Sequence, residues 1–230
     1  MNYLNDFFSL FYPNLCYACG ANLFKNEKII CTSCLFKMPK TNYHFEKDNP
    51  ICKIFWGRTM VEHATAYYFF TKTGKVQHLI HQLKYKKAKE VGIFIGEIMG
   101  KELLLSEFYR NIDVIIPVPL HPKKEKKRGY NQAEMFALGL CNSMKIPLDK
   151  TTLTRTYASE TQTRKSRFKR WENVKEIFSV NANENIKNKH ILIVDDVITT
   201  GATLESCINM LLGSIEGVKI SVAAIAVASG

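Results

Sequence analysis

The stretch KHILIVDDVITTGATLESCINMLL, residues 189–212, decides the fold of this chain. It begins with a short apolar run, residues 191–194, whose β-branched side chains are typical of a buried strand in the middle of a parallel sheet. Asp195 and Asp196 are expected to end that strand. A small, hydroxylated segment with one glycine follows, and leucine and isoleucine then recur at helical spacing. The sequence therefore predicts a strand, an acidic pair, a hydroxyl-rich loop and a helix.

This predicted unit has the chemistry of a sugar-phosphate site. A loop that opens a helix offers free backbone N–H groups and the positive end of the helix dipole, which together favour phosphate. Threonine hydroxyls add donors, and Gly201 lets the backbone approach a ligand closely. The two carboxylates can accept hydrogen bonds from vicinal sugar hydroxyls or bind a divalent cation. A ribose 5-phosphate satisfies both halves, whereas the Gly-Lys-Ser/Thr signature of a Walker loop is absent.

Composition narrows the class of protein. Apolar residues make up 46% of the 230 residues, enough for a substantial core in one or two domains. No apolar run approaches the roughly 18 residues that span a bilayer, and the first residues lack the basic region of a secretory signal, so a cytoplasmic protein is expected. The formal net charge of +11 favours polyanionic partners, either a diphosphate substrate or nucleic acid.

Two Cys-x-x-Cys pairs near the N-terminus predict a structural zinc site. The pairs are Cys16 with Cys19 and Cys31 with Cys34, a spacing typical of a tetrahedral Cys₄ site with a closed metal shell. Disulfides are the structural alternative, but no export signal accompanies them and cytosolic thiols stay reduced. A redox role is disfavoured because neither pair lies at a strand-to-helix junction.

Hydrophobic patterns outline the rest of the chain. Residues 1–15 suggest an amphipathic helix, and residues 36–56 an irregular linker. We expect strands at residues 63–70 and 218–228, and helices at residues 76–83 and 90–105. His78 and His81 have a spacing that can ligate metal, but without a third ligand nearby a solvated helix face is favoured.

A second strand–loop–helix unit lies in the middle of the chain. Residues 112–119 form an apolar run with two prolines, residues 120–132 a basic loop, and a helix is expected from Ala133. Arg128 and the neighbouring lysines can neutralise a diphosphate, and arginine can bind phosphate through two parallel hydrogen bonds. Gly129 permits a close backbone approach.

Residues 191–203 resemble the phosphoribosyl diphosphate (PRPP) loop of type I phosphoribosyltransferases. Four segments then extend the resemblance across nearly the whole chain: the cysteine pairs, HQLKY at residues 81–85, PVPLHPKKEKKRGYNQAE at residues 117–134, and VDDVITTGAT at residues 194–203. Together they are similar to the ComF family of competence proteins. The resemblance implies an α/β fold, a parallel sheet of the type I phosphoribosyltransferase kind flanked by helices, with a small zinc-ribbon domain at residues 1–50 and the transferase-like domain at residues 51–230.

The resemblance also implies site residues. Asp195 and Asp196 would hold the ribose hydroxyls of Mg²⁺-bound PRPP, and the following loop its 5-phosphate. The expected PRPP-binding set is Asp195, Asp196, Val197, Thr199, Thr200, Gly201, Ala202 and Thr203. The expected diphosphate-binding set is Lys84, Lys123, Lys127, Arg128, Gly129 and Tyr130. The expected cofactors are Zn²⁺, as a structural ion, and Mg²⁺.

The cation-rich stretch within residues 151–180 has two interpretations of equal weight. By its position it resembles the flexible loop that closes over the diphosphate in type I phosphoribosyltransferases, and it would carry Arg164, Arg167 and Arg170. It is also suited to contact the phosphates of nucleic acid, with Phe168 or Trp171 stacking on bases. Because the chain ends after its last predicted strand, a base-recognising hood is expected from the N-terminal part.

Two functional hypotheses follow. The first is a PRPP-binding competence protein that also binds single-stranded DNA and acts in DNA uptake, with other competence proteins at the inner membrane as partners. The second is an active phosphoribosyltransferase that transfers phosphoribosyl to a nucleobase or amine in nucleotide salvage. A steep fall of DNA affinity with salt favours the first hypothesis.

Overall fold

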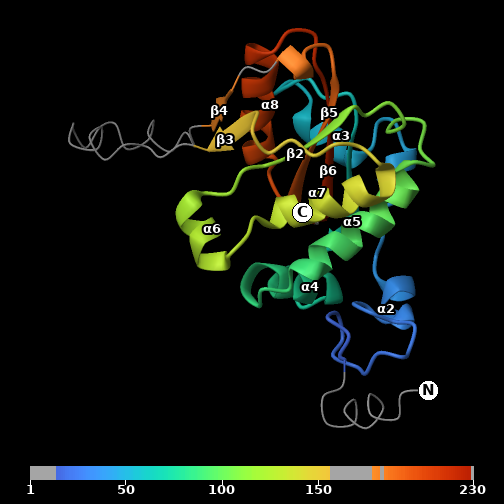
Figure 1. Cartoon of the computed structure of the whole chain (residues 1–230). Coiled ribbons are helices and arrows are strands. Elements are labelled where there is room, and N and C mark those ends of the chain that lie inside the picture. The colour runs from blue at the N-terminus through green and yellow to red at the C-terminus, as the bar shows by residue number, and fades with distance from the viewer. Residues whose placement is uncertain (1–13, 156–177, 182–183, 229–230) are drawn as a thin grey trace, which may run out of the picture.

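A computed structural model describes residues 14–155, 178–181 and 184–228 (Figure 1). Two short 3₁₀ turns, Tyr43–Phe45 and Glu184–Ile186, accompany the regular elements. The described helices are α2 (Thr32–Lys37), α3 (Pro50–Phe55), α4 (Lys75–Tyr85), α5 (Lys89–Leu103), α6 (Pro122–Arg128), α7 (Gln132–Met144) and α8 (Ala202–Ser214). The described strands are β1 (Ala64–Phe70), β2 (Val114–Pro117), β3 (Leu153–Arg155), β4 (Phe178–Val180), β5 (His190–Ile198) and β6 (Lys219–Ala228).

The centre of the molecule is a parallel sheet. Its strand order is β1-β6-β5-β2, and every neighbouring pair is parallel. The carboxyl ends of β5 and β2 therefore lie at one edge of the sheet, and the segments that follow them meet there. The expectation that the acidic pair ends its strand is wrong. β5 continues to Ile198 because β6 supplies backbone partners that far, pairing Asp195 with Ala224 and Ile198 with Val227.

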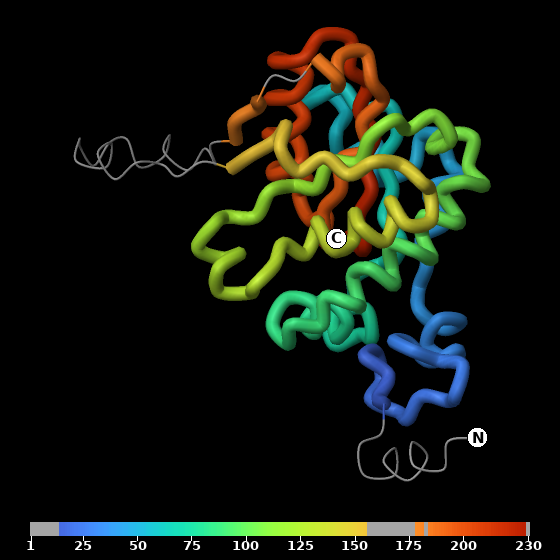
Figure 2. Tube along the Cα trace, viewed as in Figure 1, coloured from blue at the N-terminus to red at the C-terminus, as the bar shows by residue number. Residues whose placement is uncertain are grey.

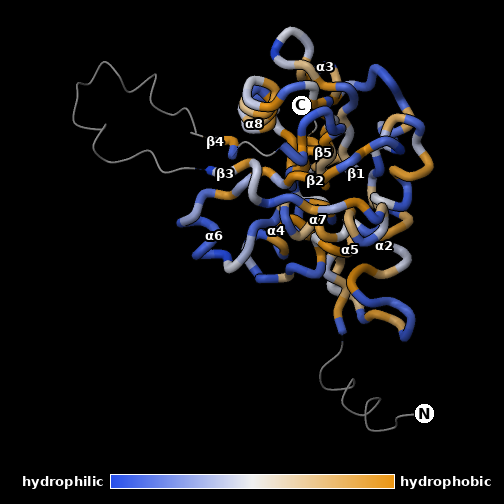
Figure 3. The backbone as a smooth tube through the Cα atoms, turned by 45° about the horizontal axis from the view of Figure 1, so that its top comes forward, coloured by the Kyte–Doolittle hydropathy of each residue, from blue (hydrophilic) through white to orange (hydrophobic). Residues whose placement is uncertain are grey.

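Two apolar cores cover the two faces of this sheet. Along β5, Ile191 and Ile193 pack into the core beneath α3 and α8, whereas Leu192 and Val194 pack into the core beneath α4, α5 and α7. All four side chains are fully buried. This alternation follows from the period of two in a strand, and it explains why the run is apolar without interruption. Figure 3 shows hydrophobic colour along the central strands and hydrophilic colour along α6.

Helices α5 and α7 pack unusually closely, because glycine lies on both sides of their contact. A Cβ atom at Gly96 would lie 2.3 Å from the Phe136 carbonyl oxygen, and one at Gly139 would lie 2.0 Å from the Ile93 carbonyl oxygen. A Cβ atom at either position would collide with the carbonyl oxygen of the other helix. The glycines thus let the two backbones touch, and α7 holds the helical layer against β2 and β5.

Two segments that were expected to be irregular are helical. The predicted linker contains α3, whose Asn49 side chain accepts hydrogen bonds from the Ile51 and Cys52 N–H groups while Pro50 opens the helix. The predicted basic loop contains α6, capped at its start by His121 and closed by Gly129 at φ +88°. Both helices carry ordinary capping signals. The short antiparallel pair β3–β4 was not predicted, and most of the expected helix at residues 1–15 lies outside the described residues.

The cysteine segment packs against the helical layer. Tyr17 donates a hydrogen bond from its hydroxyl to Glu90 on α5, which raises the pKa of Tyr17 to about 12. Cys16, Ile30 and Cys34 belong to the same buried core as α4 and α5. In Figure 2 this N-terminal trace lies beside α4 and α5. Among the described helices, none has both the length and the apolar character needed to cross a bilayer.

Candidate functional site

The acidic pair lies at the carboxyl edge of the sheet and is contacted by a lysine from α4. Lys84 Nζ is 2.9 Å from Asp196 Oδ1, and both side chains are largely shielded from solvent. The Asp196 N–H donates to Asp195 Oδ1 at 2.7 Å. A lysine expected at the diphosphate end of the site is therefore in contact with the carboxylates expected at the ribose end. This contact brings residues of the two predicted halves together.

The segment after β5 forms a small concave cradle. A hollow of about 40 Å³ is lined by residues 197–204 together with Asp195, so all the residues of the predicted PRPP-binding set except Asp196 face it. The 13-residue helix α8 begins at Ala202, and the first residues of the helix, Ala202, Thr203 and Leu204, line this hollow. The Thr200 hydroxyl accepts from the Ala202 N–H at 3.4 Å. The cradle therefore combines backbone donors, hydroxyls and the positive end of a helix dipole.

Residues from the N-terminal half of the chain, Ile54 and Arg58, contact this cradle. Gly201 has φ +74°, and a Cβ atom there would lie 2.8 Å from the Ile54 side chain on α3. Arg58 donates from Nη1 to the Thr200 carbonyl oxygen at 2.8 Å and to the Ile54 carbonyl oxygen at 3.1 Å, while its Nη2 pairs with Glu205 on α8. One guanidinium thus connects the loop, α8 and α3. Nothing in the local sequence around Arg58 indicated this role.

A basic hollow of about 260 Å³ lies next to the acidic pair, between α4 and α6. Of the predicted diphosphate-binding set, Lys84, Lys127 and Arg128 line it. The Arg128 guanidinium carbon stands 5.6 Å from the centre of the Tyr85 ring, an arrangement that orients the guanidinium. The sequence also contained three lining residues that were not predicted: Tyr85, Lys87 and Lys124. Lys87 and Lys124 lie in lysine-rich stretches and Tyr85 lies in the HQLKY motif, so the sequence held a signal for each of them.

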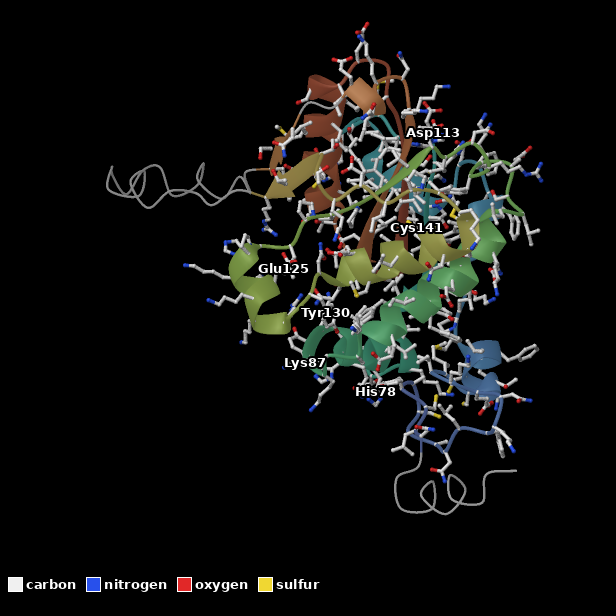
Figure 4. The ribbon with its side chains drawn as sticks, in the orientation of Figure 1. His78, Lys87, Asp113, Glu125, Tyr130 and Cys141 are labelled. Atoms are coloured by element: carbon white, nitrogen blue, oxygen red, sulfur yellow. The ribbon has the colours of Figure 1, made fainter. Side chains whose placement is uncertain are left out.

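The other three predicted diphosphate-binding residues, Lys123, Gly129 and Tyr130, do not line the basic hollow. Lys123 is exposed on α6 and does not line the basic hollow, and Gly129 ends α6. Tyr130 donates its hydroxyl to the Leu83 carbonyl oxygen at 2.6 Å, which joins the segment after α6 to α4. Burial raises the pKa of Tyr130 to about 12, so this donor stays protonated. Figure 4 labels Lys87 and Tyr130 at this end of the molecule and Asp113 at the opposite edge of the sheet.

The predicted flexible-loop residues Arg164, Arg167 and Arg170 lie outside the described residues. The described ends of that segment are β3 and β4, which pair in antiparallel register from Leu153 with Val180 to Arg155 with Phe178. Both interpretations of the segment therefore stay predictions.

The four N-terminal cysteines converge on one point. Their sulfur atoms all lie within 4.8 Å of one another, and the Cys19 and Cys31 sulfurs are 3.8 Å apart. Tetrahedral zinc with Zn–S bonds of ~2.3 Å places sulfurs about 3.8 Å apart, so the cluster fits a zinc ion. All four are free thiols, and a disulfide needs a much shorter separation. Among the described residues this is the one such cluster; His78 and His81 belong to none.

The surroundings of the cysteine cluster favour deprotonated sulfur at one ligand. Burial opposes ionisation of Cys16, but the backbone N–H groups of Cys31, Cys19 and Ala18 outweigh it and lower the pKa of that thiol to about 7. Burial and the neighbouring thiols of Cys19 and Cys31 raise the pKa of Cys34 to about 12. Several thiols crowded together resist simultaneous ionisation, and a bound cation is the group that relieves this repulsion.

Comparison with known proteins agrees with this geometry. A family model described as "Phosphoribosyl transferase domain" matches residues 126–229, which include β5, the cradle and β6. The chain is 31% identical to DNA utilization protein YhgH of Salmonella typhi over 58% of its length, and the match spans only 60% of that relative. With YhgH of Escherichia coli K12 it shares 28% identity over 82% of this chain and 80% of the relative. With competence protein ComFC of Bacillus subtilis it shares 30% identity over 47% of this chain and 42% of the relative.

Proposed function

We propose that the chain is a ComF-like protein that binds PRPP at the carboxyl edge of its sheet and acts on single-stranded DNA during DNA uptake. Its similarity to the phosphoribosyltransferase domain, to YhgH and to competence proteins supports this proposal. The observation that carries this proposal is the contact between Lys84, which lines the basic hollow, and Asp196 of the acidic pair. A cradle for phosphate, a carboxylate pair and a basic hollow follow one another along the same edge. PRPP has a 5-phosphate, a ribose diol and a diphosphate in the same order.

Each part of PRPP has a chemically suited place in this proposal. The 5-phosphate accepts hydrogen bonds from the N–H groups at the start of α8 and from the threonine hydroxyls. Asp195 and Asp196 accept hydrogen bonds from the ribose hydroxyls, and the ammonium of Lys84 balances their charge. Lys127 and Arg128 neutralise the diphosphate. Mg²⁺ would arrive on the diphosphate and reduce its charge further, and Zn²⁺ would occupy the cysteine cluster as a structural ion.

The DNA part of the proposal is supported by charge and by the family. The net charge is +11, and the 7-residue helix α6 carries five cationic side chains, of which Lys124, Lys127 and Arg128 line the basic hollow. The relatives' names associate them with DNA utilization and competence. Lysine and arginine on one exposed helix provide contacts to successive phosphates of a flexible single strand.

Calorimetric titration with PRPP and Mg²⁺ tests the PRPP part. We expect binding by the wild-type protein and at least about 100-fold weaker binding by the double variant Asp195→Asn and Asp196→Asn, because hydrogen bonds to charged groups contribute ~1.5–3 kcal/mol each. Asp113→Asn is the matched control: this carboxylate lies before β2, at the amino edge of the sheet. Equal PRPP affinity in the wild type and the double variant would contradict the assignment of Asp195 and Asp196 to the PRPP site.

Transfer of phosphoribosyl to a nucleobase or amine is the second candidate function. It is favoured by the acidic pair and the cradle, both of which are in place. In that reaction the chain's own contribution is to position PRPP and to stabilise the departing diphosphate with Lys127 and Arg128. Release of diphosphate from PRPP that depends on an added base would establish this function. PRPP binding without such release leaves the binding function alone.

The cellular setting is part of the same proposal. We place the protein in the cytoplasm, where cysteine thiols stay reduced and available to zinc. Its proposed protein partners are other competence proteins at the inner membrane, a proposal that rests on the similarity to competence proteins.

A further inference from the structure

The cysteine segment, residues 14–41, carries the two most exposed phenylalanines among the described residues. Phe36 is 91% exposed and Phe24 is 79% exposed. Neither ring packs against the apolar core that the cysteines join. The residues that line the phosphate cradle and the basic hollow all lie outside this segment, so the proposed PRPP site uses neither ring. The two rings are therefore available to a partner.

Glu27 connects the loop that carries Phe24 to the start of α2. The Phe24 N–H donates to Glu27 Oε2 at 2.9 Å, and the N–H and hydroxyl of Thr32 donate to Glu27 Oε1 at 2.6 and 2.7 Å. Phe36 follows Thr32 by four residues on α2, so both side chains lie on the same face of that helix. The carboxylate thus holds the loop at the helix face that carries Phe36, and the two rings belong to one surface.

The exposed charge beside the two rings is positive. Lys25 follows Phe24 and Lys37 follows Phe36, and both lysines are exposed. Glu27 is the one acidic residue between positions 14 and 41, and its carboxylate already accepts the hydrogen bonds just described. Zinc bound by four thiolates would leave a negative charge beneath this surface, but three of the four cysteines are buried, whereas the two lysines reach solvent.

Two adjacent phenylalanine–lysine pairs suit a single strand of DNA. In such a strand an unpaired base can stack on each ring while a neighbouring phosphate contacts the ammonium group. In duplex DNA the paired bases offer the rings no free face. A lipid bilayer suits the surface less well, because the exposed Asn22, Asn26 and Ser33 lie in the same loop and helix and lose hydrogen bonds to water on insertion.

We propose that the cysteine segment is a contact surface for single-stranded DNA, in which Phe24 and Phe36 stack on bases and Lys25 and Lys37 contact phosphates. This inference rests on the proposed action on DNA and adds to it a surface separate from α6. The basic helix α6 contributes charge alone, because its seven residues include no aromatic side chain. The cysteine segment contributes the stacking that distinguishes a single strand from a duplex.

Fluorescence anisotropy with an oligothymidine strand and the full-length protein tests the proposal. We expect Phe24→Ala with Phe36→Ala to weaken binding at least about tenfold, because two stacking contacts are lost. The same variant should bind an abasic strand with the same phosphates, and duplex DNA, as tightly as the wild type does. Lys25→Gln with Lys37→Gln should weaken both single strands and make the salt slope shallower by about 1.4, if each lysine contacts one phosphate.

Two further variants control for aromatic exposure and for folding. Trp56→Ala is the matched control, because Trp56 is 59% exposed and has the Lys53 ammonium 5.7 Å from its ring centre. It ends α3, which lies at the far end of the molecule from α2 in Figure 1. Its replacement should leave the oligothymidine affinity unchanged. Phe24→Tyr with Phe36→Tyr keeps both rings and should keep the affinity. Zinc content and melting temperature should match the wild type in every variant, since the rings are exposed.

The outcomes separate this proposal from the function on which it rests. Oligothymidine binding that the double alanine variant leaves unchanged, or an equal loss for the abasic strand, overturns the stacking surface and leaves the proposed action on DNA intact. A wild-type protein that binds no single-stranded DNA overturns both. The double alanine variant may also be tested on vesicles of phosphatidylglycerol and phosphatidylcholine. Loss of vesicle binding with full oligothymidine affinity makes the surface a membrane contact and contradicts the proposal.

Discussion

At the scale of single residues, the candidate site depends on two cations that come from different parts of the chain. Lys84 reaches the acidic pair from the last turn of α4, and Arg58 reaches the loop after β5 from the segment that follows α3. Lys84 was predicted because it lies in a motif, HQLKY. Arg58 was not, because its partners are a carbonyl oxygen and Glu205, which lie far away in the sequence. Contacts of this kind leave no local pattern.

Arg58→Lys tests whether Arg58 is a positioning residue. Lysine keeps the charge but has one nitrogen in place of the two guanidinium nitrogens that contact the Thr200 carbonyl oxygen and Glu205. We expect PRPP affinity to fall by roughly tenfold, about 1.4 kcal/mol, with little change in melting temperature because Arg58 is partly exposed. Arg110→Lys, an exposed arginine after α5, is the control. Unchanged PRPP affinity in Arg58→Lys would remove this role, and a large fall in melting temperature would make the role structural.

At the scale of elements, most helices and strands follow from local patterns, and the exceptions have a physical cause. The buried strands and the amphipathic α4 were predicted because apolar side chains repeat at the period of their element. The helices α3 and α6 were missed because each is short and one is almost entirely polar, as its hydrophilic colour in Figure 3 shows. Their caps, Asn49 and His121, were the available signals.

Two glycine substitutions, one at the contact between α5 and α7 and one on an exposed part of α8, should have opposite effects on stability. Gly139→Ala should lower the free energy of unfolding by at least ~1–3 kcal/mol, because its methyl group collides with the Ile93 carbonyl oxygen. Gly213→Ala, in an exposed part of α8 with no atom near its added methyl group, should raise it by ~0.5–1 kcal/mol. Urea denaturation measures both. A neutral Gly139→Ala would mean that the two helices are not in backbone contact.

Removal of zinc should destabilise the cysteine segment and the helices it touches. With ~2–4 °C of melting temperature per kcal/mol in a chain of this size, a loss of several kcal/mol corresponds to a fall of roughly 10 °C or more on chelation. Cys34→Ser should reproduce that fall and reduce the zinc content measured by atomic emission. Cys141→Ser, a thiol on α7 away from the cluster, should do neither. A purified protein without zinc, or one whose melting is insensitive to chelator, would contradict the zinc site.

At the scale of the whole molecule, the sheet order brings the two halves of the site together. β5 and β2 are neighbours and parallel, so the cradle after one strand and the basic helix after the other open on the same edge. The fold class was predicted from the sequence and is confirmed, because two strand–loop–helix units with buried apolar strands leave few alternatives. A further hollow of about 360 Å³ was not predictable, since its lining comes from α4 and from strand ends that are distant in sequence.

The distribution of charge predicts how DNA binding depends on salt. The logarithm of the affinity for an oligothymidine strand should fall linearly with the logarithm of salt concentration, with a slope of about −0.7 for each phosphate contacted. Lys123→Gln with Lys127→Gln on α6 should make that slope shallower by about 1.4, if each lysine contacts one phosphate. Lys187→Gln with Lys189→Gln, near the start of β5, is the control. Fluorescence anisotropy gives these slopes, and a flat salt response would count against DNA contact.

The central claim is that the carboxyl edge of the sheet holds PRPP in one orientation, and a crystal structure of the protein with PRPP and Mg²⁺ tests it most directly. We predict the 5-phosphate within hydrogen-bond distance of the backbone N–H groups of residues 201–203, the ribose hydroxyls on Asp195 and Asp196, and the diphosphate beside Arg128. PRPP bound instead in the hollow of about 780 Å³ at the opposite edge, between His63, Asp113 and His190, would contradict the account.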